Sequence, residues 1–176
     1  MRLGPLPDEH WDERSRSALA GFLPAKRRHQ RGAGNALSTL VRHPDLAEAF
    51  LVFNSYLMME STVPARLREL AILRVARRRH CAYEEFHHVR IGAKAGLTPA
   101  EIEAAGRGEA VDELEIAVLR AVDELDDDSI VSEQTWTTLS EHLSDHQRMD
   151  LIFTIGAYCL MAMAFNTFGV EPEKER

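Results

Sequence analysis

Residues 64–101 read PARLRELAILRVARRRHCAYEEFHHVRIGAKAGLTPAE, and this stretch decides the fold. Residues 65–79 carry apolar side chains on several sides of a helix, which predicts a helix that is largely buried. A second helix is predicted for about residues 82–95, ending at Gly96, because glycine tolerates the left-handed backbone that follows many helices. Residues 98–101 match a capping box with proline in the first turn. The stretch therefore predicts two consecutive helices and the beginning of a third.

Helical periodicity extends over the rest of the chain from residue 35 onward. Further helices are predicted for residues 111–125, 132–142 and 145–168, and no run alternates polar and apolar residues as a half-buried strand would. Another helix begins at Pro44 and carries an apolar stripe at three- and four-residue steps: Leu46, Phe50, Phe53 and Leu57. We therefore predict an all-α helical bundle.

Residues 1–35 are the least regular part of the sequence. They contain Pro5, Pro7, Pro24 and the run Gly-Ala-Gly at residues 32–34, with one short helix predicted around residues 12–23. The length of 176 residues suits one domain. We therefore divide the chain into an N-terminal arm, residues 1–35, and a single helical domain, residues 36–176.

Composition and charge limit the classes of partner. The formal net charge is −7, the opposite of what binding to nucleic acid phosphates favours. No secretory signal is recognisable, and no apolar run approaches the roughly 18 residues that span a bilayer. The two cysteines, Cys81 and Cys159, are too few for a secreted disulfide framework. We expect a cytoplasmic protein with a small-molecule substrate and without nucleic acid or membrane partners.

One helix face carries the most unusual chemistry in the chain. Cys81, Glu84 and His88 are spaced i, i+3 and i+7, so two helical turns bring the three side chains onto one face. Glu69 on the preceding helix is likewise directed at an apolar stripe. A buried carboxylate needs a hydrogen bond or a neutralising charge, so these groups are expected to share protons, and a neighbouring carboxylate raises the pKa of His88.

Each of these residues also has a structural interpretation. A buried histidine such as His88 is often a hydrogen-bonded core residue, and Cys81 and Cys159 are typical small core residues. The Glu-x-x-His pairs that end at His87 and His88 match one helix of a di-iron bundle. That architecture needs the motif on two helices, so we predict no metal and no cofactor.

The sequence resembles the carboxymuconolactone decarboxylase-like and alkylhydroperoxidase-like (AhpD-like) superfamily. The resemblance rests on PARLRELAIL at residues 64–73, CAYE at 81–84 and HVRIGAKAGLTPAEI at 88–102. It implies an all-helical fold, assembly as a trimer or hexamer, and a catalytic set. The peroxidase branch has a glutamate, a cysteine twelve residues later and a histidine seven residues after that. Glu69, Cys81 and His88 match these positions.

Glu84 departs from the peroxidase pattern. It occupies the place of the second cysteine, the one that attacks the peroxide, whereas the decarboxylases have a glutamate there and keep the histidine. The resemblance therefore implies a cofactor-independent decarboxylase-like lyase, or a related isomerase or hydrolase, acting on a small carboxylated or lactone-type metabolite. By analogy His88 is the general acid or base, Glu84 its partner in a proton relay, and Glu69 the group that orients Cys81 or a water.

Two alternatives stay open at this point. A thiol-dependent alkylhydroperoxidase-like reductase would use Cys81 alone. A non-catalytic oligomeric protein would only bind its ligand, since one scaffold can serve unrelated functions. No anion-binding group is singled out by the sequence; the candidates are Arg66, Arg68, Arg74 and Arg90.

Overall fold

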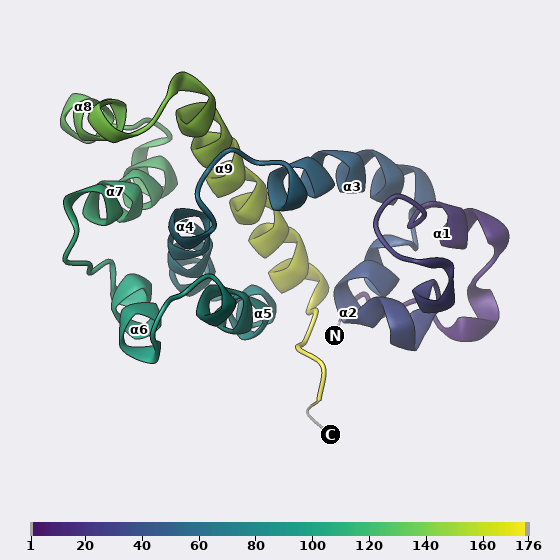
Figure 1. The fold of residues 1–176 in the computed structure, drawn as a ribbon. Coiled ribbons are helices and arrows are strands. Elements are labelled where there is room, and N and C mark those ends of the chain that lie inside the picture. Colours follow the sequence, from purple (N-terminus) through teal and green to yellow (C-terminus); the bar gives the residue numbers. More distant parts are fainter. Residues whose placement is uncertain (1, 175–176) are drawn as a thin grey trace. The chain divides into compact units, whose positions relative to one another are not determined.

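The structure is a computed structural model, and it describes residues 2–174. The described residues form helices joined by turns and include no β-strand, which confirms the predicted all-α fold (Figure 1). The chain divides into two compact units. The first holds the chain up to Glu60 together with residues from Ala164 onward, and the second holds residues 61–163.

The first unit contains short helices around one apolar cluster. Its elements are the 3-10 helices η1 (Asp8–His10) and η2 (Ala25–Arg27) and the α-helices α1 (Glu13–Ser17), α2 (Gln30–Leu40) and α3 (Pro44–Met59). The cluster is formed by Trp11, Ala18, Leu19, Leu23, Ala33, Val41, Ala47 and Leu51. The segment predicted to be an irregular arm thus contributes several residues to a core, and α2 crosses residue 35.

The buried face of α3 differs from the apolar stripe in its sequence. The buried residues are Ala47, Leu51, Asn54 and Leu57, whereas Leu46 is 56% exposed. Only Leu57 belongs to both sets. In α3, apolar residues recur at three- and four-residue steps on more than one face. Their spacing alone therefore does not determine which face of the helix is buried.

The second unit is built around α4 (Ala65–Arg78). This helix packs against α5 (Ala82–Lys94), α6 (Pro99–Arg107) and α7 (Glu113–Asp128), while α8 (Glu133–His142) packs against α7 (Figure 1). The last helix, α9 (Asp145–Phe168), belongs to this unit up to Met163. The predicted burial of α4 on several sides is confirmed: Leu67, Leu70, Ala71, Ile72, Leu73, Val75 and Ala76 are all buried.

Gly92 on α5 is buried and faces Leu73 of α4. A Cβ atom at Gly92 would lie 3.4 Å from Leu73 Cδ1, an ordinary contact, and 3.1 Å from Leu97 Cδ1, which follows α5. A side chain at this position would therefore require the Leu97 side chain to shift by a few tenths of an ångström.

The predicted helix ends are present. Gly96 follows α5 with φ of 91°, and Thr98 and Glu101 form both hydrogen bonds of a capping box before α6. Ser144 and Gln147 make the same reciprocal pair of bonds at the start of α9. Local sequence signals therefore predicted the end of α5 and the starts of α6 and α9.

Helix α9 corrects one expectation from the sequence. It has 24 residues and includes an 18-residue window of mean hydropathy 1.7, so by length and composition it could cross a membrane. A long core helix passes the same test, and 44% of the window is buried. The statement that no apolar run approaches about 18 residues is therefore wrong for α9, although this single helix is weak evidence for a membrane span.

Candidate active site

The turn between α4 and α5 places Cys81. His80 has a left-handed backbone with φ of 51°, its N–H donates to the Arg77 carbonyl, and the Cys81 N–H donates to the Ala76 carbonyl. This pair of bonds is a Schellman motif, which satisfies carbonyls at the end of α4. Cys81 is also the N-cap residue of α5. One residue therefore ends the turn and begins the next helix.

A histidine lies between two carboxylates inside the second unit. His88 Nδ1 is 2.6 Å from Glu69 Oε2 on α4, and His88 Nε2 is 3.4 Å from Glu84 Oε2 one turn earlier on α5. The exposed fractions of Glu69, Glu84 and His88 are 2%, 6% and 5%. We call these three residues the relay cluster. Glu84 and His88 lie on one face of α5, as their spacing predicts, and Glu69 approaches this face from α4.

The relay cluster favours the protonated state of His88. Burial alone lowers the pKa of an imidazole, because it disfavours the charged form. Hydrogen bonding and charge from Glu69 and then from Glu84 outweigh this effect and raise the pKa of His88 to about 9. At neutral pH the ring therefore holds a proton that a reacting group can receive.

Tyr158 is a member of the site that the sequence analysis missed. Its ring packs edge-on against His88 with centroids 5.0 Å apart, and it is 3% exposed. Burial first, and then the Glu84 and Glu69 carboxylates, raise the pKa of its hydroxyl well above 10, so the phenol stays protonated. Tyr158 lies in α9, in the apolar run IGAYCLM, where nothing in the pattern separates it from core residues.

Cys81 lies beside the relay cluster as a buried thiol. It is fully buried and is not part of a disulfide. Burial raises the pKa of the thiol, and the Glu84 carboxylate adds to the rise, whereas the Glu84 and Tyr83 amides at the start of α5 lower it. The net rise disfavours the thiolate, which is the reactive form of cysteine.

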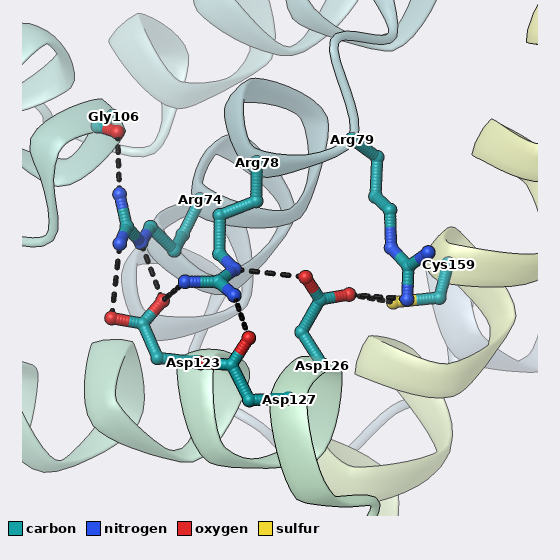
Figure 2. Close-up of polar contacts among 8 residues, drawn as sticks. All are labelled: Arg74, Arg78, Arg79, Gly106, Asp123, Asp126, Asp127 and Cys159. Atoms are coloured by element: carbon teal, nitrogen blue, oxygen red, sulfur yellow. Dashed lines mark hydrogen bonds and ion pairs between the residues drawn. The ribbon is translucent and has the colours of Figure 1, made fainter.

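Three of the four arginines considered for anion binding have other partners. Arg66 pairs with Glu101 at 2.5 Å and with Glu115 at 2.6 Å. Arg90 lies over the Phe86 ring at 4.5 Å. Arg74 donates to both carboxylate oxygens of Asp123 and to the Gly106 carbonyl (Figure 2). Arg68 alone lies next to the relay cluster, with Nε 3.7 Å from Glu69 Oε1.

A second group of charges occupies another face of α4. Arg78 pairs with Asp123, Asp126 and Asp127, and Arg79 pairs with Asp126, all on α7 (Figure 2). Cys159 lies at the edge of this group, its sulfur 3.9 Å from Asp126 Oδ1. We call the residues drawn in Figure 2 the arginine–aspartate network. It joins α4 to α7 and takes in the second cysteine, which lies in α9.

Metal-ligand geometry is not found in the part of the chain that the structure describes. Within residues 2–174 no group of three or more histidine, cysteine, aspartate or glutamate side chains is arranged to hold a metal ion.

The segment that carries these residues matches a known family. Residues 44–127 match the model of the Carboxymuconolactone decarboxylase family. This segment of the chain is therefore similar to the carboxymuconolactone decarboxylase family. The matched segment contains Glu69, Cys81, Glu84 and His88 but ends before Tyr158. No curated protein matches the chain significantly.

Two solved structures have a fold similar to that of this chain. One is a protein of unknown function from Agrobacterium tumefaciens, provisionally named an antioxidant defence protein AhpD. It is 23% identical with a TM-score of 0.69, over 76% of this chain and 94% of that one. The other is an uncharacterised peroxidase-related protein with an alkylhydroperoxidase AhpD core, from Ralstonia eutropha. It is 17% identical with a TM-score of 0.75, over 99% of this chain and 94% of that one. At these identities the likeness shows the fold.

Proposed function

We propose that the protein is a cofactor-independent lyase or isomerase of the decarboxylase-like type, with His88 as its general acid–base. The supporting observation is the relay cluster: a buried imidazole with a carboxylate at each ring nitrogen. A catalytic acid works best when its pKa lies within a few units of the working pH, and the pKa of His88 is about 9. The substrate class is a small carboxylated or lactone-type metabolite.

The reaction follows from the proton on His88. Loss of CO2 breaks a carbon–carbon bond and leaves its electron pair on the substrate as a carbanion or enolate. The imidazolium delivers its Nε2 proton to that carbon, which completes the replacement of CO2 by hydrogen. Glu69, at Nδ1, holds the ring in one orientation and stabilises its charged form. We infer that Glu84, 3.4 Å from Nε2, takes up a proton from solvent and passes it to Nε2 for the next turnover.

A second candidate function uses the thiol of Cys81. Its position at the first turn of α5 supports this function, because amide groups there lower the thiol pKa, and both similar structures are described with peroxidase or antioxidant names. Its burial and net raised pKa favour proton transfer instead. Labelling of Cys81 by dimedone after peroxide treatment would support the thiol function, and absence of an adduct would contradict it.

The test of the proposed function compares two neighbouring histidines. Carboxylated lactones and hydroperoxides are screened in parallel, and turnover is then measured for His88→Gln and His87→Gln. We expect His88→Gln to lose about 10²–10⁴-fold in kcat, the usual contribution of a general acid. His87 points about 100° away around α5, so its variant retains turnover and serves as the control. Unchanged turnover in folded His88→Gln would contradict the assignment of His88 as the general acid–base. If the wild type bound a ligand without turning it over, the protein would instead be a binding protein.

The predicted homo-oligomer is supported by an exposed apolar stripe on α9. Met149, Phe153, Leu160 and Met163 are each at least 50% exposed and recur at the spacing of one helix face. Exposed apolar stripes commonly mark protein contacts. We expect Phe153→Asp with Leu160→Asp to lower the mass measured by light scattering. The cytoplasmic location stays a prediction.

A further inference from the structure

The arginines of the second unit differ in how their donors are used. A guanidinium offers five N–H donors in a fixed fork. Arg66, Arg74, Arg77, Arg78 and Arg79 each pair with at least one carboxylate oxygen of α5, α6 or α7 at hydrogen-bond distance. These donors hold helices together. Arg68 stands apart from this set.

The Arg68 side chain makes no hydrogen bond to another residue within residues 2–174, although its backbone N–H donates to the Pro64 carbonyl. Its one ion pair joins Nε to Glu69 Oε1 at 3.7 Å, which exceeds the 2.7–3.2 Å of a protein N–H···O hydrogen bond. Its side chain is only 17% exposed, against 2% for Glu69. The guanidinium therefore has N–H donors that no protein acceptor occupies at hydrogen-bond distance and that can donate to a ligand anion.

The charge of Arg68 lies within the site. It lowers the pKa of the Tyr158 hydroxyl, against the upward effects of burial and of Glu84 and Glu69. Counted as ionised, the two glutamates and protonated His88 sum to one negative charge, and Arg68 brings the site to neutrality. A ligand anion at Arg68 would restore the excess negative charge and so strengthen the hold of His88 on its proton.

We propose that Arg68 is the anion-binding residue of this site, and that its guanidinium receives a carboxylate of the substrate beside the relay cluster. This inference rests on the proposed function for the reaction but concerns binding. The fork of a guanidinium matches the two oxygens of a carboxylate, which makes the contact directional as well as attractive.

The bound carboxylate is the one that the product keeps. A cation paired with a departing carboxylate stabilises the ground state more than the transition state, because the charge leaves that group as CO2 forms. Arg68 therefore favours substrates with an anionic group besides the reacting one. Binding of that group raises the proton affinity of His88, so the acid is loaded when the substrate is in place.

The test uses paraconate, a lactone with one carboxylate, and its uncharged carboxamide. Calorimetry at neutral pH measures the binding of both to the wild type and to Arg68→Met, Arg68→Lys and Arg107→Gln. Arg107 is the control because it is an exposed arginine that pairs with Glu109 outside the site. Circular dichroism establishes that each variant is folded.

We expect Arg68→Met to weaken paraconate binding by about tenfold or more, as for loss of hydrogen bonds to a charged group. Carboxamide binding should be unchanged. Arg68→Lys keeps the charge but loses the fork, so its affinity lies in between. Arg107→Gln binds as the wild type does. Equal paraconate affinity in wild type and Arg68→Met, or no paraconate binding by the wild type, would overturn the proposal.

Failure of this proposal is distinguishable from failure of the proposed function. His88→Gln is expected to bind paraconate even though it lacks turnover. If it binds while turnover also persists, the acid–base assignment fails and the anion site stands. If turnover is lost in His88→Gln but Arg68→Met binds the anion normally, the acid–base assignment stands and the anion site fails.

Discussion

Helix α4 carries two sets of charged residues that differ in burial and in the number of partners. On one face Glu69 reaches His88 in a site almost closed to solvent, with a contact of 2.6 Å at Nδ1 and a longer one of 3.4 Å from Glu84 at Nε2. On another face Arg74 and Arg78, with Arg79 directly after the helix, meet several aspartates of α7 at side chains that are partly exposed (Figure 2). One helix thus presents two electrostatic environments.

The difference separates proton chemistry from structural support. In the arginine–aspartate network each charge has an oppositely charged partner, and arginine does not lose its proton in proteins. In the relay cluster a titratable ring takes its proton affinity from two carboxylates in a poorly solvated place. Substitutions in the cluster should therefore change turnover, and substitutions in the network should change stability.

Among substitutions that leave His88 in place, the largest effect is expected for Glu69→Gln. The amide keeps the size of the side chain but removes the charge at Nδ1, so the pKa of His88 falls from about 9 toward 6.5. We expect kcat to fall by about 10²-fold or more, because the charged ring loses its closest stabilising group. Steady-state kinetics and NMR titration of the His88 ring measure the two changes.

Glu84→Gln is the matched comparison for that variant. Its oxygen is 3.4 Å from the ring, against 2.6 Å for Glu69, so the pKa of His88 should fall less. A larger fall in the pKa of His88 for Glu84→Gln than for Glu69→Gln would show that Glu84 raises this pKa more than Glu69 does.

The next effect concerns the network. Asp126→Asn removes the charge that pairs with both Arg78 and Arg79, and we expect the free energy of unfolding to fall by about 1–3 kcal/mol. Turnover of the folded protein should not change. Urea denaturation gives the loss, and Asp127→Asn, whose carboxylate is mostly exposed, is the control with a change of at most about 0.5 kcal/mol. If both variants lost the same free energy of unfolding, the burial of an aspartate would not determine how much its ion pairs stabilise the protein.

The third effect is on pH dependence. The general acid should be lost as pH rises through about 9, so turnover falls by about tenfold per pH unit above that value. Because the pKa of His88 is higher in the folded state, its contribution to stability is complete below pH 6.5 and disappears as pH passes about 9. A rate profile that is flat to pH 10 would contradict the role of His88.

The smallest effect is expected at the turn between the two helices. His80 adopts a left-handed backbone, which disfavours every residue with a side chain. His80→Gly should raise the free energy of unfolding by about 1 kcal/mol, less the entropy that glycine costs. Thermal melts measure the gain, and turnover should stay at the wild-type level. If His80→Gly were less stable than the wild type, the contacts of the His80 side chain would stabilise the protein by more than its left-handed backbone costs.

Local signals predicted the second unit well. The end of α5 at Gly96, the capping box at Thr98 and the shared face of Glu84 and His88 depend on residues at most seven positions apart. Such signals act through backbone geometry that is the same in every helix.

Features that depend on distant segments were out of reach. Tyr158 packs on His88 from 70 residues further along the chain, and its pattern of neighbours is that of any core helix. The resemblance assigned Glu69 to Cys81 or a water, whereas the observed contact of its Oε2 is with His88. Tertiary packing decides both, and periodicity carries no information about it.

The short connection between α4 and α5 makes the site sensitive to insertions and deletions. Only residues 79–81 separate the two helices. One residue more or fewer there would disrupt the His80 and Cys81 backbone hydrogen bonds that set this turn, and so would move His88 relative to Glu69. Both helices would still form and each side chain would still be present, but the relay would be gone. Chain length in this turn is therefore as strict a requirement for the chemistry as the identity of the acid itself.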